Sequence, residues 1–182
     1  MEPKKPVETT IEIPEGVQVE KEGFLIKVTG PKGELTRRIT DKSTIVNITA
    51  ENVEIKFKKP KKTRKKNMNT LSAHIRNMIK GVNDGYTYKL KICSGHFPMT
   101  VSLKGDVFEV KNFIGESVPR RLKLKQGVEV KISGEIIEVT STDKELAGQT
   151  SASIETMMKR PGFDKRIFQD GIYITEKDGK AV

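Results

Sequence analysis

The alternation of apolar and polar positions predicts paired β-strands along the first half of the chain. Residues 17–30 (VQVEKEGFLIKVTG) alternate on both sides of a turn at 20–23, which is the pattern of a β-hairpin. Residues 31–39 (PKGELTRRI) continue as a further extended segment. A second hairpin is predicted for residues 45–57 (IVNITAENVEIKF), with its turn at 50–52.

After the second hairpin the apolar period changes from two residues to about 3.6, the period of an α-helix. The apolar side chains on one helical face are Leu71, Ile75, Met78, Ile79 and Val82. Asn69 is the predicted N-cap, and Gly81 or Gly85 is the predicted end of the helix.

The second half of the chain repeats this order. Residues 99–110 (MTVSLKGDVFEV) predict a hairpin that turns at 104–106. Residues 112–124 (NFIGESVPRRLKL) match 29–41 (TGPKGELTRRITD) in position. This match places the pair Arg37, Arg38 opposite the pair Arg120, Arg121. Residues 128–140 (VEVKISGEIIEVT) match the second hairpin of the first half.

The strongest internal match is between two helices. Residues 143–159 predict the second helix, with Thr142 and Glu145 placed as a capping box. Without a gap, 149–159 and 70–80 share five identities in eleven positions. We therefore predict an α+β fold of two tandem duplicated units, each a small, mainly antiparallel sheet packed against one helix.

This duplication predicts the organisation of the domains. Two α+β repeats, 11–85 and 97–175, are joined by a linking strand at 86–96. The polar ends, 1–10 and 176–182, are predicted to be flexible.

Positive charge is concentrated in one segment. The chain has 34 Lys and Arg, 24 Asp and Glu, and a net charge of +10. Seven of the basic residues lie within residues 58–66. Pro60 predicts a loop there, and such a focused patch favours a polyanionic partner, nucleic acid first and an anionic membrane second. The candidate phosphate contacts are Lys61, Lys62, Arg64, Lys65 and Lys66. A solvated loop and a nuclear localisation signal are the alternatives.

Two further surfaces combine residues suited to RNA. In 158–177 the basic residues Lys159, Arg160, Lys165 and Arg166 alternate with aromatic residues that include Phe163 and Phe168. Arginine holds phosphates through paired donors, and exposed rings stack on unpaired bases. The alternative is that Phe168, Ile172 and Ile174 close the second core as a final strand. Residues 94–99 (SGHFPM) and the turn 112–116 (NFIGE) allow a partner to approach closely, but an ordinary junction is an equal alternative.

Enzyme and metal chemistry have little support in the sequence. One cysteine, Cys93, and two histidines, His74 and His96, do not provide the usual zinc spacings. No phosphate-binding loop, dinucleotide motif, membrane-length apolar run or secretory signal is found in the sequence. We therefore expect no catalysis, cofactor or metal, a reducing compartment and no membrane association.

Four segments, in this order and spacing, carry a family resemblance. They are 74–82 (HIRNMIKGV), 96–99 (HFPM), 112–116 (NFIGE) and 166–177 (RIFQDGIYITEK). From about residue 11 to 177 the chain resembles large-subunit ribosomal protein six in its archaeal and eukaryotic form, numbered nine in eukaryotes. The absence of a longer extension makes it more similar to the archaeal form.

The resemblance implies a structural constituent of the cytoplasmic large ribosomal subunit, without catalysis or obligate homo-oligomers. It implies contacts with large-subunit rRNA near the factor-binding region, the base of the stalk and the sarcin–ricin loop. It also implies neighbouring ribosomal proteins at the stalk base and translation factors nearby. In this family the second domain makes most rRNA contacts. The matching positions here include Ser94, Gly95, His96, Lys159, Arg160, Lys165, Arg166, Phe168 and Gln169.

The resemblance and the charge distribution point to different halves of the chain. A separate contact between residues 61–66 and another rRNA segment reconciles them, and this contact is not part of the family pattern. A stand-alone binder of messenger RNA or DNA and a nucleotide-using enzyme are the alternatives from other functional classes.

Overall fold

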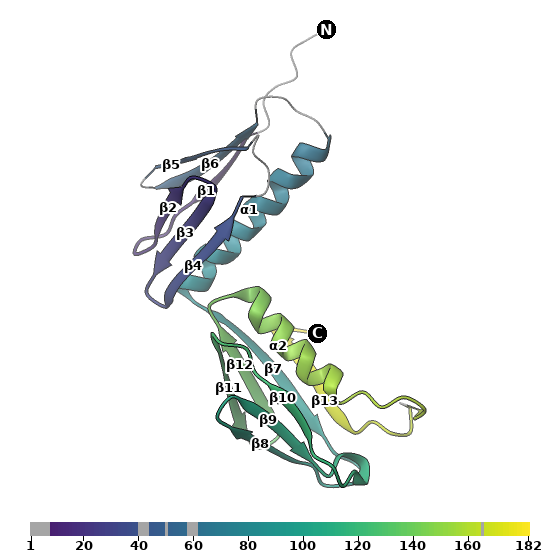
Figure 1. Ribbon diagram of the computed structural model, residues 1–182. Coiled ribbons are helices and arrows are strands. Elements are labelled where there is room, and N and C mark those ends of the chain that lie inside the picture. The colour runs from purple at the N-terminus through teal and green to yellow at the C-terminus, as the bar shows by residue number, and fades with distance from the viewer. Residues whose placement is uncertain (1–7, 40–43, 50, 58–61, 165) are drawn as a thin grey trace. The chain divides into compact units, whose positions relative to one another are not determined.

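The computed structural model describes residues 8–39, 44–49, 51–57, 62–164 and 166–182. The chain forms two compact units, unit 1 (Met1–Gly85) and unit 2 (Tyr86–Val182). Each contains small antiparallel sheets and one long helix (Figure 1). The predicted α+β fold with an internal duplication is confirmed.

Unit 1 contains two three-stranded antiparallel sheets. The first has the order β1-β6-β5, formed by β1 (Glu8–Glu12), β6 (Asn52–Phe57) and β5 (Thr44–Ile48). The second has the order β2-β3-β4, formed by β2 (Gln18–Glu22), β3 (Leu25–Gly30) and β4 (Gly33–Arg38). Helix α1 (Lys62–Asn83) packs against both sheets.

Unit 2 repeats this plan and adds two strands. Its larger sheet has the order β11-β12-β7-β13-β14. These strands are β11 (Val128–Ser133), β12 (Ile136–Ser141), β7 (Tyr86–Cys93), β13 (Gly171–Lys177) and β14 (Lys180–Ala181). Its three-stranded sheet is formed by β8 (Thr100–Lys104), β9 (Val107–Lys111) and β10 (Arg120–Lys123). The helices are η1 (Phe113–Gly115) and α2 (Lys144–Met157).

Strand β7 is the central strand of unit 2, whereas residues 86–96 were expected to link the two units. It pairs with β12 as β1 pairs with β6, so it is the first strand of the second repeat. Its other edge pairs with β13. The face of β7 that packs on the core contains Tyr86, Tyr88 and Leu90, which are buried, while Lys89 and Lys91 lie on the more exposed opposite face.

Regular structure also extends into the ends of the chain that were expected to be flexible. Strand β1 begins at Glu8, inside the predicted segment 1–10. Strand β13 continues to Lys177 and is followed by β14, inside the predicted tail 176–182. Backbone pairing with β6 and β13 orders these polar residues without requiring that they be buried.

The two helices align in the structure as they do in sequence. Ile75 and its counterpart Ile154 are fully buried, and so are Ser72 and Ser151. Each helix covers a separate apolar core. The predicted helical face is thus confirmed, and Met68, which is 2% exposed, extends it by one turn toward the N-terminus.

Helix α1 begins earlier than predicted. Its first residue is Lys62, so the expected loop is wrong for residues 62–66 and Asn69 lies inside the helix rather than at its cap. Residues 58–61 lie outside the described part of the chain. Pro60 precedes the helix, and lysine and arginine are good helix formers, so a helical start is favourable there.

The start of α2 differs from the prediction by one residue. Asp143, and not Thr142, is the N-cap, and its Oδ1 accepts a hydrogen bond of 2.8 Å from the backbone N–H of Glu145. A carboxylate at this position also interacts favourably with the helix dipole.

The arginine pairs are not structurally equivalent. Gly23 and Gly105 occupy matching hairpin turns, with φ of 60° and 58°. Five residues after each glycine, Val28 lies opposite Leu35 and Val110 lies opposite Arg120. The pairs are therefore two positions out of register, because residues 112–119 form a longer connection in unit 2 than residues 31–32 in unit 1.

Candidate functional site

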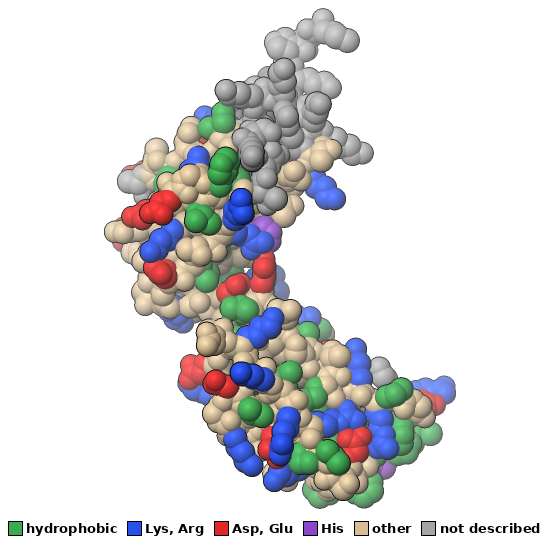
Figure 2. Space-filling view, viewed as in Figure 1, with side chains coloured by type: hydrophobic (Ala, Val, Ile, Leu, Met, Phe, Trp, Pro, Cys, Tyr) green, Lys and Arg blue, Asp and Glu red, His purple; other side chains and the backbone are tan. Residues whose placement is uncertain are grey.

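Three loops meet at one end of unit 2, which we call the loop end. They are residues 94–99 after β7, residues 112–119 between β9 and β10, and residues 158–170 between α2 and β13 (Figure 1). Lys and Arg side chains lie beside apolar side chains on this part of the surface (Figure 2). The loop end therefore combines charge and apolar area on three loops, of which the second contains the short helix η1.

A buried carboxylate fixes the first loop. The side chain of Asp170 is 2% exposed, and its Oδ1 accepts hydrogen bonds from the backbone N–H groups of Gly95 (2.5 Å) and His96 (3.0 Å). Its Oδ2 lies 2.5 Å from Nδ1 of His96. Burial favours the neutral acid, but these contacts with His96 and Gly95 outweigh burial and lower the pKa of Asp170. An ionised Asp170 thus holds 94–99 against the start of β13.

Aromatic rings connect this loop to the end of α2. The ring of His96 lies 4.9 Å from that of Phe168, and Phe168 meets Phe163 edge-on, also at 4.9 Å. The guanidinium of Arg160 lies 4.3 Å from the centre of the Phe163 ring. Such stacked and cation–π contacts connect residues 160–163 to Phe168 and His96, although the described residues of 158–164 and 166–170 form no strand or helix.

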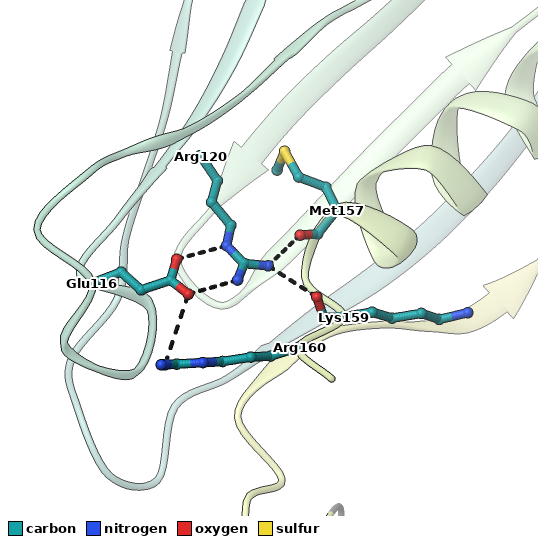
Figure 3. A network of polar contacts seen from close by, with 5 residues as sticks. All are labelled: Glu116, Arg120, Met157, Lys159 and Arg160. Atoms are coloured by element: carbon teal, nitrogen blue, oxygen red, sulfur yellow. Dashed lines mark hydrogen bonds and ion pairs between the residues drawn. The ribbon is translucent and has the colours of Figure 1, made fainter. Parts of the chain in front are cut away.

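Arg120 joins the second loop to the third (Figure 3). Its Nε and Nη2 each donate a 2.7 Å hydrogen bond to the carboxylate of Glu116. Its Nη1 donates to the carbonyl oxygens of Met157 (2.5 Å) and Lys159 (3.2 Å), at the end of α2. Arg120 therefore donates hydrogen bonds to carbonyl groups at the end of the helix while two of its nitrogens bind one carboxylate.

Glu116 is the shared partner of two arginines (Figure 3). Arg160 Nη1 lies 3.7 Å from its carboxylate, in addition to the paired contact with Arg120. The hydrogen bond from Arg120 is the main cause of a lowered pKa of Glu116; burial opposes it, and the charges of Arg120 and Arg160 reinforce it. This network keeps the carboxylate ionised and sets the position of both arginines.

The second loop also contacts the first. Asn112 Nδ2 donates a 3.0 Å hydrogen bond to the carbonyl oxygen of Pro98. Gly115, at φ 73°, lies against the ring of Phe97, since a Cβ placed on it would be 3.7 Å from that ring. All three loops therefore support one another.

The comparison with known proteins agrees with the duplication. A family model described as Ribosomal protein L6 matches residues 13–85 and 97–171, once in each unit. The chain belongs to the ribosomal protein L6 family. The predicted family resemblance is confirmed.

Two relatives match this L6 chain over most of its length. It is 44% identical over 180 residues to the large ribosomal subunit protein uL6 of Ignicoccus hospitalis, covering 94% of this chain and 95% of the relative. It is also 44% identical over 172 residues to large ribosomal subunit protein uL6 of Methanococcus vannielii, covering 94% of each chain. The L6 chain is therefore a structural constituent of the large ribosomal subunit and not an enzyme.

The loop end brings together most of the residues predicted in the second half. Ser94, Gly95, His96 and Gln169 line a shallow hollow of about 380 Å³. Lys159, Arg160 and Phe168 line an adjacent hollow of about 270 Å³. Phe168 is partly buried between its aromatic neighbours, so only part of its ring is accessible. Residues that are far apart in the sequence of unit 2 thus form one surface.

Arg166 is the most exposed of the predicted arginines at the loop end. Its side chain is 90% exposed, and its Nη2 donates a 2.8 Å hydrogen bond to Asp164. The neighbouring Ile167 is 64% exposed. Lys165 lies outside the described residues.

The other predicted basic residues belong to unit 1. Lys65 and Lys66 are exposed in the first turns of α1. Lys62 and Arg64 are also helical, but their side chains are outside the described part of the structure, as is all of Lys61. The L6 chain therefore carries its predicted basic residues on two separate units.

Sequence reasoning missed the acidic residues that hold the loop end. Asp170 was not predicted, although it lies directly before Gly171 at the start of a predicted strand. Glu116 and Arg120 were not predicted as a pair, although they stand four positions apart. Both signals are common in sequences, so neither would identify a site without the three-dimensional contacts.

Among the residues that the structure describes, no group of three or more metal-ligating side chains comes together. Neither α1 nor α2, the long helices of the described ranges, has the length and apolar composition needed to cross a membrane.

Proposed function

We propose that the loop end of unit 2 is the main rRNA-binding surface of this L6 protein. The proposed location of the protein is near the factor-binding region of the large subunit, by the stalk base and the sarcin–ricin loop. Neighbouring ribosomal proteins contact it there, translation factors act nearby, and it works as a single copy. The supporting observation is that Asp170 and Arg120 fix three loops on which the predicted RNA-binding residues lie together.

The arrangement suits recognition of RNA shape. Arg166, Lys159 and Lys165 supply charge for phosphates, which positions the RNA but does not discriminate sequence. Ser94, Gln169 and the exposed part of His96 offer small polar groups to a minor groove or an irregular junction. Because the loops are held by internal contacts, little order must be gained when RNA binds.

Residues 61–66 form a second contact with a different rRNA segment. The first turn of α1 contains no acidic residue, and Lys65 and Lys66 are exposed on the next positions. The partial positive charge of a helix N-terminus makes such lysines unfavourable unless an anion is near. An rRNA phosphate supplies that anion.

Crosslinking of assembled large subunits tests both contacts. We expect residues 159–171 to crosslink to rRNA around the sarcin–ricin loop, and residues 61–66 to crosslink to a separate segment. Crosslinks to many unrelated RNAs through 61–66 alone would instead support a stand-alone nucleic-acid binder. The same particles washed in high salt are the control, since specific contacts at the loop end should persist longest.

A further inference from the structure

The outer face of the β8–β9–β10 sheet is unusually rich in positive charge. In the strand register, Ser102, Glu109 and Arg121 lie side by side across the three strands. Because side chains alternate along a strand, the neighbouring positions on the same face can be assigned. The charged residues of this cationic sheet face are Lys104, Glu109, Lys111, Arg121 and Lys123.

Glu109 is at the centre of this face and is covered by cations. Its side chain is 4% exposed, although it points away from the apolar core. The cationic nitrogens of Lys104, Lys111 and Arg121 lie 3.5, 3.6 and 3.6 Å from its carboxylate. Burial raises the pKa of Glu109, but the charges of Lys104, Arg121 and Lys111 outweigh it and the pKa is lowered.

One carboxylate does not neutralise these cations. Lys104, Lys111 and Arg121 are 65%, 50% and 65% exposed, so at least half of each side chain remains in contact with solvent. Their distances to Glu109 are longer than those of close charge-assisted hydrogen bonds, which leaves donors for another anion. Lys123 adds a fourth positive charge on the same face.

The equivalent face of unit 1 has the opposite charge arrangement. Lys27 occupies the position of Glu109, four residues after the turn glycine. It lies 2.7 Å from Glu34, and this hydrogen bond is the main cause of a raised pKa, to which the charges of Glu20 and Glu22 also contribute. The fold therefore does not require a cationic face, and the charge is particular to unit 2.

We propose that the cationic sheet face of unit 2 binds the phosphate backbone of RNA, separately from the loop end. This inference rests on the proposed rRNA-binding role of unit 2. The face contains no exposed aromatic side chain and no loop, so its contacts follow charge and spacing and are independent of sequence. The loop end then provides selectivity, and the sheet face provides affinity.

Salt-dependent binding tests the proposal in the full chain. The variant Lys104→Gln, Lys111→Gln, Arg121→Gln is compared with Lys131→Gln, Lys177→Gln, Lys180→Gln, which loses the same charge elsewhere in unit 2. Filter binding is measured with large-subunit rRNA and with an unrelated duplex RNA. For the first variant the log–log salt slope should fall in magnitude by about 2 to 3 on both RNAs, because each phosphate contact contributes about 0.7–0.9. A fall no larger than that of the control variant overturns the proposal.

A second variant covers the case in which the triple variant does not fold. Glu109→Gln removes the central negative charge and should tighten binding to the unrelated duplex by about threefold or more, because it frees three cations. Glu129→Gln removes the same negative charge at an exposed position, where the carboxylate lies 3.2 Å from Nζ of Lys131 and both side chains are 65% exposed. Equal effects of the two substitutions would contradict a specific role for the sheet face.

The same binding data separate this proposal from the function of the loop end. Sheet-face variants should retain the preference for large-subunit rRNA over the unrelated duplex, whereas Arg166→Glu should reduce it. A sheet variant that removes the preference, while Arg166→Glu does not, would overturn the assignment of affinity and selectivity to these surfaces. If Arg166→Glu keeps the preference and the sheet variants still lower the slope, only the loop-end function is contradicted.

Discussion

Units 1 and 2 share one arrangement of strands and helix, but unit 2 contains additional segments. In both, a first strand pairs with the second strand of a later hairpin, and a three-stranded sheet and one helix complete the core. Unit 2 adds β13 on the free edge of β7, a longer connection at 112–119 and the loop 158–170. These three additions border the loop end, whereas the added strand β14 pairs with the other end of β13. Duplication thus preserved the core, while the candidate site was formed by additions at its border.

The two units also differ in the sign of their charges at equivalent places. The first turn of α1 contains no acidic residue, whereas α2 begins with Asp143 and Glu145. On the sheets β2–β3–β4 and β8–β9–β10 the signs are reversed. Lys27 lies among glutamates in unit 1, and Glu109 lies among cations in unit 2. A shared fold therefore leaves surface charge free to diverge, and each unit can meet a different part of an anionic partner.

Removing the basic residues at the start of α1 has the largest expected effect on RNA binding. The variant replaces Lys61, Lys62, Arg64, Lys65 and Lys66 with glutamine. Its log–log salt slope for large-subunit rRNA should fall in magnitude by about 3.5–4.5, since each lost phosphate contact removes about 0.7–0.9. Filter binding across a salt series measures this slope. An unchanged slope would mean that these side chains are only solvated.

Reversing one charge at the loop end should matter more than reversing one on α1. In a folded protein, Arg166→Glu should weaken rRNA binding by roughly tenfold, because a phosphate contact becomes a repulsion. Lys65→Glu is the matched change in unit 1 and should have a smaller effect. Incorporation into reconstituted large subunits measures both, and equal defects would contradict the idea that unit 2 carries specificity.

Replacing Arg120 by lysine tests the network that connects the loops. The substitution Arg120→Lys keeps the charge but loses the paired hydrogen bond to Glu116 and one contact with the end of α2. The free energy of unfolding should fall by about 1–2 kcal/mol. Chemical denaturation measures it, with Arg121→Lys, 65% exposed, as the control. Equal losses would show that the forked contact with Glu116 adds little.

Of the four changes, acidification should have the smallest effect: it should weaken the contacts that hold the loop end. The folded-state pKa values of Asp170 and Glu116 lie below their ordinary values, so each stabilises the fold above pH of about 4–5 and loses this contribution as pH falls through its lowered pKa. Amide exchange at Gly95 and His96, followed from pH 6 to pH 3, should show loss of protection. Asp170→Asn should make that exchange less dependent on pH. Protection that is insensitive to pH in the natural chain would contradict this role of the carboxylate.

Much of the fold could be predicted because its hairpins are local. The turns at Gly23 and Gly105 are followed by alternating residues that pair with their immediate neighbours in the chain. The place of β7 could not be predicted in this way, since both its partners, β12 and β13, lie far along the chain. The start of α1 was missed because residues 62–66 contain no apolar residue to mark a helical face.

The candidate site was predictable in its cations and aromatic residues but not in its acids. Basic and aromatic side chains in 158–170 are close together in sequence, so they were identified as one surface. Asp170 reaches residues 75 positions away, at Gly95, and its burial depends on those partners. A sequence pattern shows that an acidic residue is present, but its burial follows only from the folded chain.

The position of β7 has a consequence for the order of folding during synthesis. Every element of unit 1 has been made once Gly85 is translated. In unit 2 the first strand, β7, cannot complete its pairing until β13, the strand before the last, has been made. The ion pair between Lys89 of β7 and Glu176 of β13 spans 87 positions. Closing so long a loop is slow, and until β13 emerges β7 has an open edge. A prematurely terminated chain would therefore contain a finished first unit and an aggregation-prone second one.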